Sequence, residues 1–206
     1  MANTVWDRIE EARARHDVLQ HPFYIRWSAG ELTSDELARY SGQYRHAVTA
    51  IADLSDEAAA ELPDHPELAS HADEERAHIE MWDGFVEAVD GDSSAAANAE
   101  TAQCVEVWTE RDGALSALAR LYAIESGQPE ISKTKLEGLA EHYDIDGAES
   151  PEGTRYFTVH RGRDVEHAAE GRELLEELIR TPADEDVVVA AAERAFEANW
   201  RLLDGV

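Results

Sequence analysis

The chain has 206 residues, and 45 Asp and Glu against 18 Lys and Arg give it a net charge of −27. This length suits one domain, 1–206, with a sizeable core, and so negative a surface excludes a nucleic acid as partner. We find no secretory signal and no apolar run near the roughly 20 residues that a membrane helix needs, so we expect a cytoplasmic protein without membrane contact. The acidity predicts adaptation to a saline cytoplasm, where salt screens self-repulsion.

Helix signals follow one another along the whole chain. We expect helices at 4–19, 33–61, 66–89, 95–125, 129–143, 151–180 and 182–203, with His21-Pro22 ending the first and a loop at 144–150. Thr33 and Glu36 form a capping box at the start of the second helix. The only β-branched run, Val187-Val188-Val189, lies among alanines that favour helix. The pattern predicts an all-α, single-domain bundle of about seven helices.

Three potential metal ligands are spaced along one predicted helix. His160, Asp164 and His167 stand at i, i+4 and i+7, which places their side chains on one helical face over two turns. Two imidazoles and a carboxylate are a ligand set for a transition metal, especially non-haem iron. This face therefore predicts one half of a metal site.

Two earlier helices offer the opposite half. Glu75 and His78 form Glu-x-x-His, a pair that builds di-iron sites in helical bundles but also occurs on exposed acidic helices. Glu74 and His71 lie near the same face, so either is an alternative ligand. Glu125 continues an apolar stripe, where burial is costly unless the carboxylate is paired or binds a metal. It is otherwise a polar helix end facing water.

Three histidines and three carboxylates suit two iron ions, or an iron and a manganese ion, with open positions for dioxygen or substrate. The predicted ligand set is Glu75, His78, Glu125, His160, Asp164 and His167. The chain has one cysteine, Cys104, so an internal disulfide and a multi-cysteine metal site are excluded.

Further motifs resemble the haem-oxygenase-like bundle of TenA, PqqC and chlamydial CADD-type proteins. They are His-Pro-Phe at 21–23 followed by Trp27 and Gly-x-Leu at 30–32, the Tyr40 to His46 segment, and Tyr156-Phe157 continuing to His167. The resemblance covers nearly the whole chain. It implies a haem-oxygenase-like fold and is compatible with a homodimer.

Within that family the ligand pattern is most similar to the dimetal oxidase branch. The resemblance implies a dioxygen-activating oxidase with a small organic substrate and dioxygen as co-substrate. CADD-type members make p-aminobenzoate from one of their own tyrosines, with an amino group from a lysine. Tyr24, Tyr122 and Lys135 are the counterparts here, and Lys135 is one of only two lysines. A surface lysine is the alternative for Lys135.

Other activities in the family stay open. A TenA-like thiaminase needs a nucleophilic cysteine, but Cys104 lies early in its helix and suits a small buried hydrophobe. A metal-free PqqC-like oxidase would use the carboxylates as acid–base groups around an organic ligand. A non-enzymatic helical binding protein or regulator would require the ligand side chains to be exposed or far apart.

Overall fold

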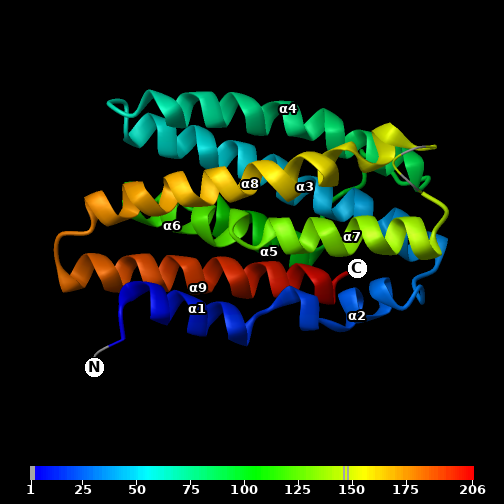
Figure 1. Ribbon diagram of the computed structural model, residues 1–206, viewed down its shortest axis with the longest axis horizontal. Coiled ribbons are helices and arrows are strands. Elements are labelled where there is room, and N and C mark those ends of the chain that lie inside the picture. The colour runs from blue at the N-terminus through cyan, green and yellow to red at the C-terminus, as the bar shows by residue number, and fades with distance from the viewer. Residues whose placement is uncertain (1–2, 146, 148) are drawn as a thin grey trace.

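The computed structural model describes residues 3–145, 147 and 149–206. In these residues the chain forms nine α-helices and one 3-10 turn, η1, without a strand (Figure 1). Their bounds are α1 Val5–Arg15, η1 Val18–Gln20, α2 Pro22–Ser28, α3 Ser34–Glu61, α4 Pro66–Ala88, α5 Ala99–Trp108, α6 Ala114–Glu125, α7 Gln128–His142, α8 Pro151–Leu178 and α9 Pro182–Asp204. The predicted helical bundle is confirmed, and residues 146 and 148 of the expected 144–150 loop lie outside the described part.

Two helix boundaries differ from the sequence-based expectation. The segment 95–125 is two helices, because Gly113 between α5 and α6 has φ 101°, a conformation that glycine alone adopts readily. The first helix was expected to run to residue 19, but α1 ends at Arg15 and η1 follows it, while His21-Pro22 begins α2. The His21 ring accepts a hydrogen bond from the Phe23 backbone N–H at 3.1 Å, and Pro22 occupies the first helical position.

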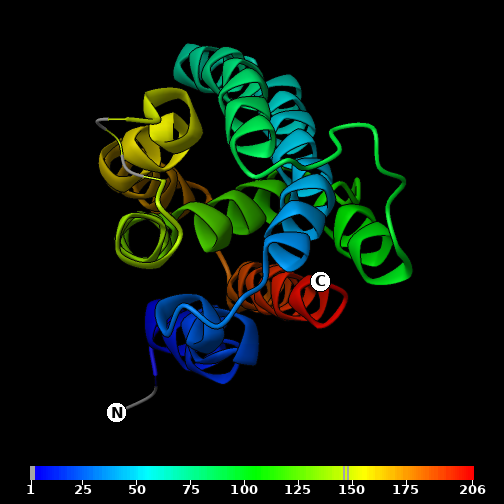
Figure 2. The same ribbon diagram turned by 90° about the vertical axis from the view of Figure 1, so that its right-hand side faces the viewer.

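Helix α6 runs through the middle of the bundle (Figure 2), where it packs against α3, α8 and α9. All ten of its residues from Ser116 to Glu125 are buried, although this stretch ends in a carboxylate. Helices α4 and α8 pack against each other on the adjacent side. This arrangement brings α4, α6 and α8 together around one buried region. No helix among the described residues is long and apolar enough to cross a membrane.

Gly138 on α7 marks a close approach to α2. A Cβ atom at this position would lie 2.5 Å from two ring atoms of the fully buried Trp27. We expect Gly138→Ala to lower the free energy of unfolding by about 1–3 kcal/mol through overpacking. Gly162→Ala in α8 is the control, since nothing lies within 4 Å of its added Cβ. It should raise stability by up to about 1 kcal/mol. Urea unfolding of both variants measures these changes in the free energy of unfolding. Equal changes in the two variants would contradict the prediction.

Candidate metal centre

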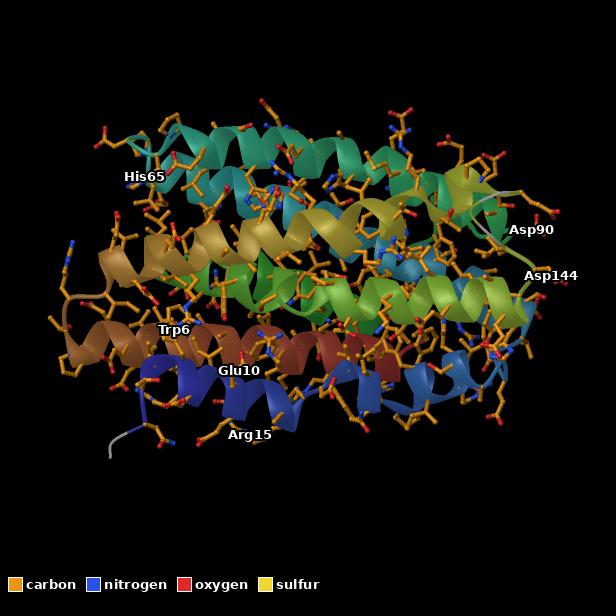
Figure 3. All side chains as sticks on the ribbon, in the orientation of Figure 1. Trp6, Glu10, Arg15, His65, Asp90 and Asp144 are labelled. Atoms are coloured by element: carbon orange, nitrogen blue, oxygen red, sulfur yellow. The ribbon has the colours of Figure 1, made fainter. Side chains whose placement is uncertain are left out.

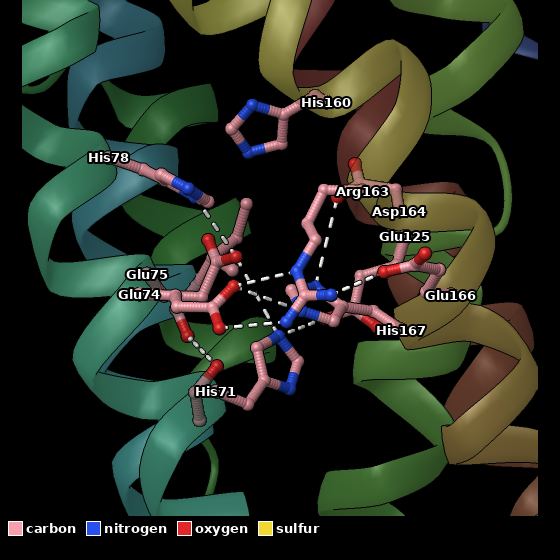
Figure 4. Close-up of polar contacts among 12 residues, drawn as sticks. His71, Glu74, Glu75, His78, Glu125, His160, Arg163, Asp164, Glu166 and His167 are labelled. Atoms are coloured by element: carbon pink, nitrogen blue, oxygen red, sulfur yellow. Dashed lines mark hydrogen bonds and ion pairs between the residues drawn. The ribbon is translucent and has the colours of Figure 1, made fainter.

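Two helices present the same pattern of donors to each other. Helix α8 carries His160, Asp164 and His167, and α4 carries His71, Glu75 and His78 with the same i, i+4, i+7 spacing. All six side chains are buried, and Figure 4 shows them converging on the space between the helices. Glu125 at the end of α6 completes the set and is also buried.

The donors form two groups, each with its ligand atoms within 4.8 Å of one another. One group is His71, Glu125 and His167, and the other is Glu75, His78 and His160. Glu75 also connects the groups, since its Oε1 lies 3.1 Å from His78 Nδ1 and 3.6 Å from His71 Nε2. All six predicted ligands are therefore in one buried region, together with His71.

Several of the donor atoms make no hydrogen bond with the protein. Buried atoms without a hydrogen bond include both carboxylate oxygens of Asp164, both ring nitrogens of His167 and Nε2 of His160. Buried polar atoms are rarely unpaired in native proteins, and a cluster of them points to a group that they bind. His160 Nδ1 lies 2.7 Å from the Tyr156 carbonyl oxygen. A hydrogen bond there fixes the ring and leaves Nε2 as a ligand. The residues fit a pair of transition metal ions.

Burial and mutual contact shift the titration of these groups strongly. Burial, reinforced by the charges of Glu125 and Glu75, raises the pKa of Asp164 to about 9. Burial lowers the pKa of His160 to about 4. Burial also disfavours the charged form of His71, but its contacts with Glu125 and Glu75 outweigh this and raise its pKa to about 10. Without metal, bound protons therefore offset part of the negative charge of the carboxylates in the cluster. Metal ions replace these protons when they bind.

Glu74 has a different partner from its neighbours on α4. Its two oxygens each lie 2.8 Å from a guanidinium nitrogen of Arg163, which also pairs with Glu166 (Figure 4). This bidentate contact joins α4 to α8 beside the cluster. Of the alternatives that the sequence left open, the structure brings Glu75 and His71 into the donor groups. Glu74 pairs with Arg163 and lies at the edge of the cluster, with its Oε2 3.4 Å from His167 Nε2.

The sequence contains a second signal for His71, which the motif-by-motif comparison missed. Residues 71–78 read His-x3-Glu-x2-His, and residues 160–167 read His-x3-Asp-x2-His. The Glu75-x-x-His78 motif by itself does not include His71. Comparing the two segments with each other would have placed His71 in the set beside Glu75.

Lys135 on α7 lies in a buried chamber of aromatic rings. Its Nζ is 4.8–5.8 Å from the ring centroids of Tyr24, Tyr40, Tyr44, Trp82 and Phe157. It makes no ion pair with any described residue, and burial lowers its pKa to about 7. The surface alternative for Lys135 is wrong. Phe157 of α8 is thus part of this ring chamber.

The ring chamber adjoins the donor cluster through Trp82 and Tyr156. The Trp82 ring is 4.9 Å from the Tyr156 ring, which stacks on His160 with centroids 3.8 Å apart. At the far side, the hydroxyls of Tyr24 and Tyr40 are 3.5 Å apart. Sequence reasoning assigned no role to Trp82, which lies one helical turn after His78.

Two other residues from the sequence lie away from the cluster. Tyr122 packs edge-on against Trp6 of α1 at 5.2 Å and lines a separate cavity of about 440 Å³ with Arg13. Although Tyr122 is one turn before Glu125, the structure does not bring it to the donor groups. Cys104 is buried in α5, and burial raises the pKa of its thiol, which opposes a role as nucleophile.

The neutral form of Lys135 gives a prediction about stability. Because its pKa is about 7 in the fold and 10.5 as a free side chain, the unfolded chain binds more protons between these values. Stability from this group therefore rises with pH across that window. We expect Lys135→Met to be more stable than wild type at pH 7, with the gap narrowing by up to about 1.4 kcal/mol per pH unit toward pH 10. Urea unfolding at several pH values measures the difference in free energy of unfolding between the variant and wild type. A difference that stays constant with pH would contradict the prediction.

Known proteins share both the sequence pattern and the fold. The model of a family described as iron-containing redox enzyme matches residues 67–200. A 4-aminobenzoate synthase of Chlamydia muridarum is 32% identical over 96% of this chain and 88% of its own length. Its counterpart in Nitrosomonas europaea is 29% identical over 99% of this chain and 91% of its own length.

Solved structures agree on the architecture. A domain with a heme oxygenase-like fold from Shewanella denitrificans has a TM-score of 0.82 at 20% identity, covering 100% of this chain and 92% of its own. A TenA homologue from Pseudomonas syringae pv. tomato has a TM-score of 0.80 at 17% identity, covering 97% and 89%. The haem-oxygenase-like fold expected from the sequence motifs is thus confirmed. With the family match spanning more than half of its residues, the chain belongs to the iron-containing redox enzymes and is an oxidoreductase.

Proposed function

We propose that the chain is a dimetal oxidase that uses dioxygen to form 4-aminobenzoate, with the ring from its own Tyr24 and the amino nitrogen from Lys135. One observation carries the dimetal site: seven buried side chains from three helices converge, and six of them leave a buried donor atom without a hydrogen bond. The product follows from the activity named for the two relatives. A helical binding protein, by contrast, would require exposed or distant donors.

The metal-holding residues of the proposal are the six predicted ones and His71. The groups His71, Glu125, His167 and Glu75, His78, His160 would each hold one ion, with Asp164 available to both. Bound iron ions would supply the redox chemistry that activates dioxygen, and mixed imidazole and carboxylate ligands also accept manganese in one position. The carboxylates offset the charge of the ions, which makes two close cations tolerable in a buried site.

Tyr24 and Lys135 meet two requirements of the proposed reaction. A lysine whose pKa is about 7 is substantially neutral near physiological pH, and only the neutral amine is a nucleophile. Burial raises the pKa of Tyr24 well above its ordinary value, so the phenol keeps its proton. Its ring lies 5.8 Å from Lys135 Nζ. The surrounding rings exclude water from both groups.

The test is a single-turnover experiment. Metal-free protein is loaded with iron under anaerobic conditions and exposed to dioxygen, and 4-aminobenzoate and the mass of the chain are measured by mass spectrometry. We expect Tyr24→Phe to bind iron but form no product. Tyr122→Phe is the matched control and should keep activity close to wild type, since Tyr122 packs against Trp6. Formation of 4-aminobenzoate by Tyr24→Phe would contradict the assignment of Tyr24. So would a result in which Tyr122→Phe is the only variant that forms no product.

A further inference from the structure

A cavity of about 250 Å³ connects the donor cluster with the surface. It lies between α4, α6 and α8, toward the end of the bundle where α4 begins, which His65 marks in Figure 3. Its lining includes His71, Glu125 and His167, one complete donor group. The cavity therefore leads to one of the two groups.

The inner end of the cavity contains buried donor atoms of the cluster. His167 is 3% exposed, and neither of its ring nitrogens makes a hydrogen bond. Glu125 Oε1 is buried as well, and it lies 2.9 Å from Nε2 of His71, a member of the same donor group. Leu68, Leu118 and Leu174 line the cavity on α4, α6 and α8, so the polar atoms are reached past apolar side chains.

The outer part of the cavity is acidic. Glu170, Glu173 and Glu177 of α8 line it, are exposed, and make no ion pair with any described residue. Glu67 faces them from α4. No lysine or arginine is among the lining residues. Charges of one sign along a cleft with apolar walls raise the local concentration of the opposite ion.

We propose that this cavity is the loading route for the metal centre, in which Glu170, Glu173 and Glu177 capture a divalent cation from solvent and pass it to His167 and Glu125. The inference rests on the proposed dimetal function. Carboxylate oxygens replace water around a hard divalent ion one at a time, which eases its passage toward the mixed nitrogen and oxygen donors. The cavity beside Tyr122 is less suited, because none of the seven donor residues lines it.

Charge removal at the cavity tests the capture step. Metal-free protein is mixed anaerobically with Fe²⁺ at low ionic strength, quenched with a chelator at set times, and assayed for retained iron. We expect a Glu170→Gln, Glu173→Gln, Glu177→Gln triple variant to take up iron about 10-fold more slowly than wild type while reaching the same final content. Raising the salt concentration should slow the wild type toward the rate of this variant.

The control removes the same charge elsewhere. Glu87, Glu137 and Glu141 are exposed, make no ion pair with any described residue, and do not line this cavity. Their triple Gln variant should retain the wild-type rate within about 2-fold, since these charges lie outside the cleft whose apolar walls concentrate the field. Equal slowing of both triples, or no slowing of either, would overturn the loading route.

A second pair of variants tests the path itself. Gly171 lines the cavity and has no atom within 4 Å of an added Cβ, and Gly162 on the same helix has equal space but lies outside it. Gly171→Leu should obstruct the route and slow uptake, and Gly162→Leu should not. A lower final iron content in the Gln triple would also overturn the inference, because the residues would then be ligands. If wild-type protein itself fails to retain about two iron ions, the dimetal function fails instead.

Discussion

Asp164→Asn is expected to lose most of the bound iron without loss of the fold. Even a partner outside the first ligand shell is worth about 10–100-fold in metal affinity, so removing a direct ligand should cost about 100-fold or more. Asparagine keeps the shape of the acid but brings no negative charge to offset two cations. Iron content after gel filtration, and the shift in melting temperature on adding Fe²⁺, measure the effect.

The metal-free state separates this loss from misfolding. Because burial raises the pKa of Asp164 to about 9, the side chain is protonated at pH 7 without metal, and asparagine replaces a neutral group by a neutral group. The metal-free variant should therefore melt close to metal-free wild type. Glu166→Gln is the control, since that carboxylate is exposed and pairs with Arg163. Normal iron content in Asp164→Asn would remove Asp164 from the ligand set.

Lys135→Arg is expected to abolish 4-aminobenzoate formation while leaving the ligands in place. An arginine side chain stays protonated under all working conditions, so it offers neither the nucleophile nor the transferable nitrogen. Its charge would also be unpaired among the rings of the chamber, and Lys135→Met serves as a neutral variant that avoids this cost. Both should form no detectable product in the single-turnover experiment, and Lys135→Met should bind iron normally.

Because the chain has so few lysines, isotope labelling can show whether a lysine supplies the amino nitrogen of 4-aminobenzoate. Lys133 and Lys135 are the only lysines, and Lys133 is exposed on the same helix. Protein grown with ¹⁵N-labelled lysine should yield ¹⁵N-labelled 4-aminobenzoate, and Lys133→Arg should yield it equally. Unlabelled product, or loss of product in Lys133→Arg, would show that another group supplies the nitrogen.

Local spacing predicted the part of the site that lies on single helices. His160, Asp164 and His167 share one face because the helix repeat requires it, and the structure brings that face to the cluster. Glu125 was predictable from the cost of burying a carboxylate in an apolar stripe. The break before α6 was also readable in principle, since Gly113 lies inside the expected helix 95–125 and glycine favours a positive φ.

The ring chamber could not be predicted in the same way. Its rings come from α2, α3, α4 and α8, while Lys135 comes from α7, so no single segment contains the pattern.

Tyr122 shows that a position close to a ligand in the sequence can also mislead. It adjoins Glu125 in sequence and lies only one helical turn from it, yet its ring packs against α1. Proximity along a helix does not decide which neighbouring helix a side chain contacts.

The burial of α6 has a consequence for how the site responds to thermal motion. Because its residues from 116 to 125 are buried among neighbouring helices, we expect the amide protons inside α6 to exchange with solvent slowly. Helices α4 and α8 each have a solvent-facing side, and exchange there should be faster. Of the seven donors, Glu125 alone lies on the enclosed helix.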